Sequence, residues 1–535
     1  MPEAGTEERV GGKVAGAASA IALIHLSARV LGFVEKMLTA RYFGTSDRAD
    51  AYTVAVKVPS TIFYGCEKIL NPSFIPSFID IKKREGEQAA WRLAGTTILL
   101  QGIILGVLVI AGQLLAQPLV LLVAPGYAPG TPTGSPEKVE LTVRLMRTIF
   151  SSVMFLGISS TTYCILNAYK RFATPALGDA FWKVGTVAGL IVLYGRLDIF
   201  ALAIGFVAGA VLKLGTHVVA LGRALLKLRV GMTLSDPTFR RMILLMLPMA
   251  FGFAYSELRA LFDIRFASPL SPGAVAALNY SRTITDLPYQ VVAYALGIAL
   301  FPFLAEHASS ERWTDLKSLF MSSMRMLVFL FVPTTVALFI LSEPTLRAIY
   351  QSGEFNEESL RLTVPALEFY ALGMLAQALE CVILQTFYSL KNTLVPTLIG
   401  LGTTALHIGL SWWLVNTLSA DDPRGLALAY TLARYVKVIV AFGFLAVAVK
   451  GLPLGPHAGF VLKVLIACAA MALVMHLAYG GIVTWHPLTG RKDAIAAFGA
   501  CAVVGGTVYI IASTLLGVPE VRSAARRIGE RVKRG

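Results

Sequence analysis

Charged side chains recur within segments of the chain that are otherwise apolar, and their types and spacing indicate anion binding. Arg29 and Lys36 are seven residues apart, two turns of a helix, so they share a helix face. Lys57 lies in the next apolar segment, and Arg282 lies in one of the second half. If these segments cross a membrane, each charge costs at least about 2.5 to 3.5 kcal/mol and should face protein or a wet cavity. We therefore predict that the four cations line a cavity for an anionic substrate.

Acidic side chains accompany the cations, and both a functional and a structural role are open for them. Glu35 adjoins Lys36, and Asp286 follows Arg282 by four residues, a spacing at which opposite charges neutralise each other on a helix. Glu67 lies near the end of a long apolar segment, where a charged side chain can reach the membrane interface. We predict that four acids line the cavity or contribute to gating: Glu35, Asp50, Asp286 and Glu67.

The composition indicates which elements position these residues. Hydrophobic residues make up 56% of the 535-residue chain and charged residues 15%, and the mean hydropathy is +0.68. A helix needs about 20 apolar residues to cross a bilayer, and roughly fourteen stretches reach that length. They begin near residues 17, 49, 92, 140, 175, 199, 238, 274, 316, 360, 394, 424, 457 and 492. We expect an all-α polytopic membrane protein with about 14 transmembrane helices.

The two halves of the chain resemble each other. Phe74-Ile-Pro76 corresponds to Leu300-Phe-Pro302 with an offset of 226 residues, and two later motifs that end at Pro175 and Pro396 are offset by 221. The similarity predicts two pseudo-symmetric six-helix bundles that enter the membrane in the same direction, followed by two extra helices. The expected divisions are an N-terminal bundle, a C-terminal bundle, two extra transmembrane helices and a basic cytoplasmic tail, at residues 1–230, 231–450, 451–518 and 519–535.

The net charge of +15 fits an orientation signal better than a nucleic acid partner. With both termini placed in the cytoplasm, roughly 23 basic residues lie in inner loops and about 8 outside, the bias typical of inner-face loops. The sequence holds no G-x-x-x-x-G-K-[ST] motif to bind a nucleotide phosphate. The five cysteines lie in apolar spans without the spacing of metal ligands, so we expect no metal site.

Several short motifs, in order over most of the chain, resemble the MurJ/MviN family. They are Arg29-Val-Leu-Gly-Phe33, Ala49-Asp-Ala-Tyr52, Phe74-Ile-Pro76, Ala124-Pro-Gly-Tyr127, Ile165-Leu-Asn-Ala-Tyr-Lys-Arg-Phe172, Ile349-Tyr-Gln-Ser-Gly-Glu-Phe355 and Phe387-Tyr-Ser-Leu-Lys391. That family belongs to the multidrug/oligosaccharidyl-lipid/polysaccharide exporter superfamily, whose members have two six-helix bundles. Members of the MurJ/MviN family flip lipid II, the undecaprenyl-pyrophosphate-linked peptidoglycan precursor, across the bacterial inner membrane.

The resemblance implies a V-shaped cavity lined by spans 1, 2, 7 and 8, and a groove for the lipid tail formed by spans 13 and 14. Arg29 matches the family's first cavity arginine and Asp50 its aspartate, whereas the family's second arginine, followed by aspartate, is here Glu35 followed by Lys36. We expect a set of cavity cations to engage the diphosphate by charge-assisted hydrogen bonds: Arg29, Lys36, Lys57 and Arg282. The acids Glu35, Asp50 and Asp286 would position those cations or help to close the outer gate.

The expected function is therefore a lipid II flippase for cell wall biosynthesis, a transporter that works by alternating access without covalent chemistry. No cofactor is expected, and the membrane potential or an ion gradient would drive transport. Expected partners are lipid II or a related undecaprenyl-pyrophosphate-linked glycan, membrane lipids and, as candidates, cell wall synthesis enzymes, with the chain a monomer and no nucleic acid bound. A flippase for another polyprenyl-linked oligosaccharide, a non-transporting membrane scaffold and a drug exporter are the open alternatives.

Overall fold

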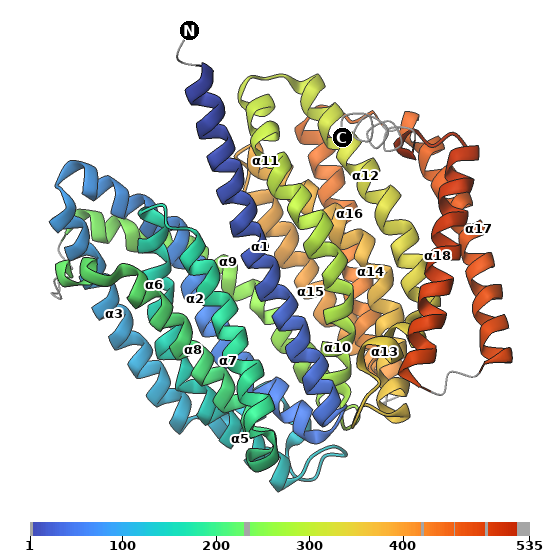
Figure 1. Ribbon diagram of the computed structural model, residues 1–535, viewed down its shortest axis with the longest axis horizontal. Coiled ribbons are helices and arrows are strands. Elements are labelled where there is room, and N and C mark those ends of the chain that lie inside the picture. The colour runs from blue at the N-terminus through green and yellow to red at the C-terminus, as the bar shows by residue number, and fades with distance from the viewer. Residues whose placement is uncertain (1–3, 229–235, 419–421, 454, 487–489, 522–535) are drawn as a thin grey trace. The chain divides into compact units, whose positions relative to one another are not determined.

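The computed structural model describes residues 4–228, 236–418, 422–453, 455–486 and 490–521 (Figure 1). Within those ranges every regular element is helical. Two compact units divide the chain, Met1–Pro272 and Gly273–Gly535. The predicted division at residue 230 and most of the predicted tail lie outside the described residues, and the predicted bundle boundaries stay predictions.

The described residues of the first unit form nine α-helices. In chain order they are α1 (Ala4–Phe43), α2 (Asp47–Arg84), α3 (Glu87–Leu114), α4 (Ala116–Val123), α5 (Pro136–Phe150), α6 (Ser152–Ala168), α7 (Ala173–Leu197), α8 (Phe200–Leu221) and α9 (Pro237–Ala267). Short polar residues begin several of them. Ser46 and Ser135 each accept a hydrogen bond from a backbone N–H in the first turn of the helix that follows, and Pro136 occupies the first position of α5.

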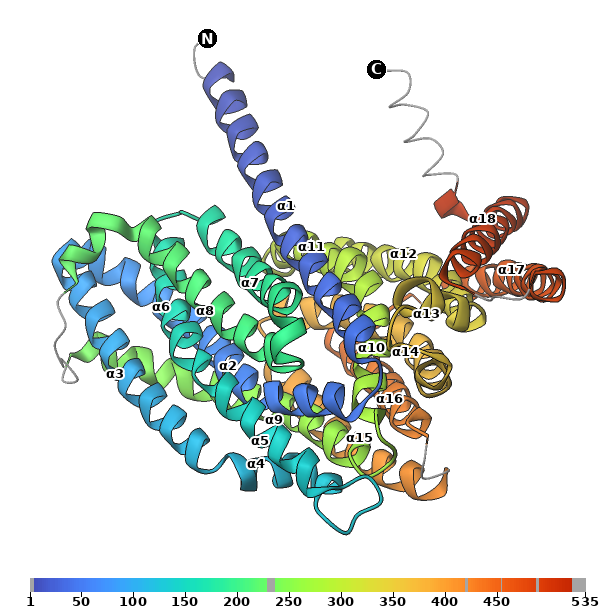
Figure 2. The ribbon, with the colours of Figure 1, turned by 60° about the horizontal axis from the view of Figure 1, so that its bottom comes forward.

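Nine more α-helices lie in the described part of the second unit. They are α10 (Ala274–Pro288), α11 (Tyr294–Ser309), α12 (Trp313–Ile340), α13 (Ser342–Tyr350), α14 (Glu357–Ser389), α15 (Leu394–Thr417), α16 (Arg424–Ala448), α17 (Gly455–Trp485) and α18 (Arg491–Leu515). A π-helical turn, Tyr289–Ala293, joins α10 to α11, so that the two form one continuous span. The two extra helices expected at the end of the chain are α17 and α18, which pack side by side (Figure 2).

Twelve described helices are long and apolar enough to cross a membrane. They correspond one to one with the third to fourteenth predicted spans, beginning with Glu87–Leu114 and ending with Arg491–Leu515. Helices α1 and α2 lie at the first two predicted spans but are not among these twelve, so the predicted count of 14 is approximate. The expectation of an all-α polytopic membrane protein is confirmed.

The internal repeat is visible in helix lengths and in one turn. Helices α3 and α12 both contain 28 residues, and Pro136–Ala168 and α14 both contain 33. At the end of the longer pair the chain makes the same turn twice, with Lys170 at φ 59° and Lys391 at φ 56°. In each turn the lysine N–H bonds back to the third residue before it and the next N–H bonds five residues back. This is the Schellman closure, a common end for helices, and here it closes two helices that correspond in the repeat.

Small residues let α7 and α8 approach closely, which fixes the framework of the first unit. Gly185 and Gly189 of α7 face Gly209 and Gly205 of α8, and a Cβ on Gly185 would collide with the backbone of Gly209. Both helices therefore carry a G-x-x-x-G pattern, the usual device for close helix packing in membranes. Lys183 of α7 and Lys213 of α8 project from this closely packed pair.

Candidate functional site

One charged contact of the first unit joins α2 to α9. Lys57 Nζ lies 2.7 Å from Glu257 Oε2, and Thr61 donates a second hydrogen bond to the same oxygen at 3.1 Å. The side chains of Lys57 and Glu257 are 22% and 20% exposed. The structure thus places the predicted cation Lys57 against a carboxylate while both keep an open side.

The predicted residues of α1 lie on different sides of that helix. Glu35 is buried and accepts an ion pair from Lys183 of α7 at 2.7 Å, whereas its neighbour Lys36 is half-buried. Arg29 lies on an exposed part of the helix. The structure therefore links Glu35 to a lysine 148 residues away, a partner that the sequence analysis missed.

Asp50 belongs to a cluster at the start of α2. It is 1% exposed, and Lys138 Nζ lies 3.4 Å from its carboxylate and 2.6 Å from that of Asp47. The same ammonium group lies 4.1 Å from the ring centroid of Tyr127, in the turn between α4 and α5. Burial, together with the nearby carboxylates, raises the pKa of Tyr127, so its hydroxyl stays neutral. This cluster ties α2 to the turn that precedes α5.

A further buried pair lies between α7 and α8. Lys213 is 1% exposed, contacts Asp179 at 2.6 Å and lies near the rings of Phe63 and Trp182, at 4.6 and 5.6 Å. The predicted residue Glu67 is half-buried on α2. The sequence analysis missed Asp179, Lys183 and Lys213, although each carries the signal used for Arg29, a charge within an apolar span.

In the second unit, the predicted pair Arg282 and Asp286 lies on α10. The Arg282 Nε and Asp286 Oδ2 atoms are 3.8 Å apart, and the side chains are 29% and 28% exposed. Asp286 also accepts a hydrogen bond from Gln377 of α14 at 3.1 Å. The Arg282 guanidinium lies 5.1 Å from the ring centroid of Tyr430 on α16. The contact between the two charged groups is long, so Arg282 is held as much by the ring as by the carboxylate.

A second set of charges lies beside this pair, between α14 and α16. Glu380 contacts Arg434 at 3.0 Å and Lys437 at 2.7 Å, and the Arg434 guanidinium lies 4.6 Å from the Tyr430 centroid. Tyr430 therefore packs against two guanidinium groups, those of Arg282 and Arg434. The sequence analysis missed Glu380, Arg434 and Lys437 as well, and the same signal would have found them.

The internal repeat places one buried or half-buried cation at corresponding positions in the two units, Lys213 and Arg434. Lys213 and Arg434 are 221 residues apart, the offset of the second repeat motif, and they occupy corresponding helices, α8 and α16. Each is paired with a carboxylate from another helix and packed against an aromatic ring. Each unit thus holds its cations in paired, ring-stacked positions within its membrane helices. The two pairs differ in burial: the Lys213 side chain is 2% exposed, whereas that of Arg434 is 18% exposed.

Comparison with known proteins gives a consistent result. A family model described as "Lipid II flippase MurJ" matches residues 39–489. Among curated relatives, a probable lipid II flippase MurJ of Bdellovibrio bacteriovorus is 28% identical over 460 residues, which cover 84% of this chain and 85% of that protein. The lipid II flippase MurJ of Burkholderia cenocepacia is 24% identical over 500 residues, covering 90% of this chain and 94% of that protein.

Solved structures agree on the fold. A lipid II flippase MurJ in an inward closed conformation superposes with a TM-score of 0.78 at 22% identity, covering 92% of this chain and 98% of that one. An inward-facing multidrug resistance MATE family transporter of the MOP superfamily gives 0.66 at 13% identity, with coverages of 80% and 98%. At these identities the likeness concerns the fold alone. Because the family model matches most of its length, the chain belongs to the MurJ family of lipid II flippases.

Proposed function

We propose that this chain moves lipid II from the inner to the outer leaflet of the bacterial inner membrane by alternating access. The observation that carries the proposal is the contact of Lys57 with Glu257 on membrane helices of a chain from this family. A cation that is partly exposed and already faces a carboxylate can bind the diphosphate of a lipid-linked precursor without first losing a full hydration shell.

The proposed binding step is an exchange of partners. In the absence of substrate, Glu257 and Asp286 hold Lys57 and Arg282. A diphosphate carries more negative charge than a carboxylate and offers several acceptor oxygens, so it competes for these cations. Before substrate binds, each carboxylate neutralises its cation, which reduces the free-energy penalty of holding an uncompensated charge within the membrane helices.

The remaining predicted residues are assigned by the same logic. We propose that Arg29 and Lys36 of α1 also engage the diphosphate. Glu35 positions a cation through Lys183, and Asp50 acts at the turn before α5 through Lys138. Glu67 is assigned a supporting acidic role on α2.

The proposed cycle uses no covalent chemistry. The membrane potential or an ion gradient supplies the drive, and the potential is worth about 2.3 kcal/mol per charge per 100 mV. The polyprenyl tail stays in lipid beside α17 and α18 while the headgroup crosses. Both termini are placed in the cytoplasm, in keeping with the excess of basic residues in the loops of that side.

Complementation tests the proposal. A bacterium depleted of its own lipid II flippase should grow when it expresses this chain and lyse when it expresses Arg29→Ala at the same membrane level. Arg361→Ala is the matched control, because Arg361 is exposed at the start of α14 and pairs with Glu358. Lysis with the wild-type chain at normal membrane levels would favour another polyprenyl-linked glycan as the substrate. Growth with Arg29→Ala would contradict the role given to that residue.

A further inference from the structure

A cavity of about 600 Å³ opens in the second unit, away from Arg282 and Asp286. Its walls come from the first turns of α12, from the connection between α16 and α17, and from His457 at the start of α17. Three membrane-spanning helices begin or end here: α12 begins at Trp313, α16 ends at Ala448, and the α17 span begins at His457. The mouth of the cavity therefore lies where these helices leave the hydrocarbon core.

One face of α12 is polar over its first turns. The residues that line the cavity recur at intervals of three, one, three, one and three, the spacing of a single helix face: Thr314, Lys317, Ser318, Met321, Ser322 and Arg325. A polar stripe on a membrane helix needs water or a polar ligand opposite it, because hydrocarbon cannot satisfy its hydrogen bonds.

The basic groups of the cavity are anchored and retain donors. Lys317 Nζ donates one hydrogen bond, to the Lys450 carbonyl at 3.2 Å, and an ammonium group has three donors. Arg325 is held by Glu520 at 2.7 Å and packs over the ring of Phe460 at 4.6 Å. Among the described residues, neither Arg325 Nε nor His457 Nδ1 has a hydrogen-bond partner, although both atoms are buried. Two cations and a histidine thus face one carboxylate, which leaves a basic surplus.

An apolar strip continues from the basic groups along α17. Val461 and Leu465 follow His457 at intervals of four, so they lie on the same helix face, and they are 38% and 51% exposed. A ligand that fits both surfaces has an anionic head and an apolar tail.

We propose that this cavity binds the phosphate of an anionic membrane phospholipid, with the acyl chains along Val461 and Leu465. With both termini in the cytoplasm, as proposed above, the start of α12 and the end of α16 face the cytoplasm. Basic pockets between membrane helices on that side suit such headgroups, because the inner leaflet is rich in anionic lipid. The site is separate from the residues assigned to the transported substrate, and it gives α17 a lipid-dependent contact with α12.

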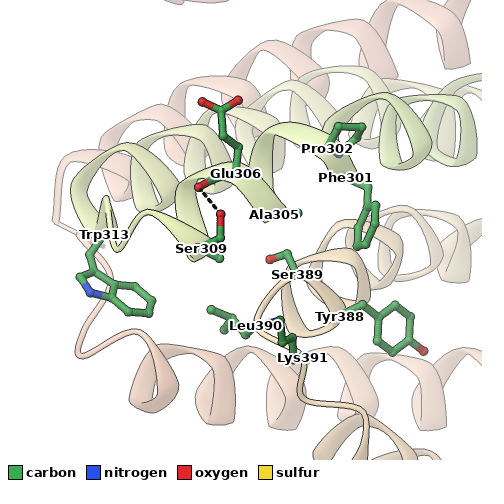
Figure 3. A pocket seen from close by; sticks show the side chains of 11 residues that line it. Phe301, Pro302, Ala305, Glu306, Ser309, Trp313, Tyr388, Ser389, Leu390 and Lys391 are labelled. Carbon is green, nitrogen blue, oxygen red and sulfur yellow. Dashed lines mark hydrogen bonds between the residues drawn. The ribbon is translucent and has the colours of Figure 1, made fainter.

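The second unit holds another cavity, and its charged groups differ from those of the cavity beside α12 and α17. It measures about 680 Å³ and lies between α11 and the turn after α14. Figure 3 shows that Phe301, Trp313 and Tyr388 surround it. Lys391 and Glu306 both line it, so its charged groups are of opposite sign. The described residues that line that cavity therefore carry no basic surplus.

Native mass spectrometry of the full chain in detergent tests the proposal. The protein is offered equal amounts of phosphatidylglycerol and phosphatidylcholine, and the bound lipid is counted. The wild-type chain should retain phosphatidylglycerol in preference to phosphatidylcholine. Lys317→Ala should retain about fivefold less, since one basic group near a membrane surface contributes about that factor. Ser318→Asp, at an exposed position, should abolish the preference by adding a negative charge.

Arg361→Ala removes a cation at the start of α14, outside this cavity, and should retain lipid as the wild type does. Equal retention of the two lipids by the wild type would overturn the proposal. So would unchanged retention in both Lys317→Ala and Ser318→Asp. Parallel titrations with undecaprenyl diphosphate and inorganic phosphate identify the source of the phosphate. If Lys317→Ala and Ser318→Asp lose binding of undecaprenyl diphosphate or inorganic phosphate but still retain phosphatidylglycerol, the cavity does not bind an anionic phospholipid as proposed.

Discussion

Lys57 and Glu257 are 200 residues apart in the sequence, yet their side chains meet at 2.7 Å between α2 and α9. Thr61 shares the same carboxylate oxygen from one turn further along α2. The carboxylate is therefore held from α2 by two groups, and the contact fixes how α2 packs on α9 within the first unit. It is also the pair on which the proposed exchange with substrate depends.

A double-mutant cycle should show coupling across this pair. Lys57→Ala and Glu257→Ala should each lower stability, and the double variant should lose less than the sum, with a coupling energy of about 1 kcal/mol or more. Thermal unfolding of the purified chain in detergent measures it. The exposed pair Glu358 and Arg361 is the control, where we expect about 0.5 kcal/mol or less because both side chains reach solvent. Equal coupling in the two pairs would show that burial adds nothing.

In the buried pair Lys213 and Asp179, removal of the carboxylate should destabilise the chain more than removal of the positive charge. Asp179→Ala leaves the Lys213 ammonium, 2% exposed, without its carboxylate and should cost about 3 to 5 kcal/mol. Lys213→Met keeps the volume among the aromatic rings and removes the charge that must be compensated, so it should cost much less. Thermal unfolding again gives the comparison. A larger loss for Lys213→Met than for Asp179→Ala would contradict this account.

The glycine contacts between α7 and α8 predict a position-dependent cost. Gly209→Ala places a methyl group against the Trp182 backbone and side chain and should destabilise the chain by about 1 to 3 kcal/mol. Gly215→Ala, on the same helix, meets no atom within 4 Å and should be neutral or slightly stabilising, since alanine favours a helix. The free energies of unfolding of the two variants should therefore change in different directions or by clearly different amounts.

Loss of the buried contact between Asp50 and Lys138 should raise backbone hydrogen exchange in the neighbouring segment. Asp50→Ala removes a buried carboxylate from Lys138 and should increase hydrogen exchange in the Tyr127 turn and in the first turn of α5. Asp47→Ala is the comparison, because it removes the other carboxylate beside Lys138, and the Asp47 side chain is 53% exposed whereas that of Asp50 is 1% exposed. Exchange measured by mass spectrometry on peptides of residues 124–140 reports the difference. Greater exchange in Asp47→Ala would place the stabilising contact at Asp47 instead.

Much of the fold could be predicted because the bilayer restricts it. A spanning helix must satisfy its backbone internally and present about 20 apolar residues, so hydropathy located the helices within a few residues. The predicted span near 394, for example, is α15, which begins at Leu394. The internal repeat could also be predicted from the sequence motifs, and in the structure Lys170 and Lys391 close corresponding helices with the same turn.

The sequence by itself determined which residues carry charge inside the membrane helices and, through helical period, which of them share a face. It placed Arg29, Lys57 and Arg282 among the candidates without any knowledge of their neighbours. Only the tertiary structure decided the partners: Glu35 meets Lys183, Asp50 meets Lys138, and Lys57 meets Glu257. The physical reason is that periodicity fixes a direction around one helix axis. Which helix lies in that direction depends on packing summed over the whole unit, including close approaches such as that of Gly185 to Gly209.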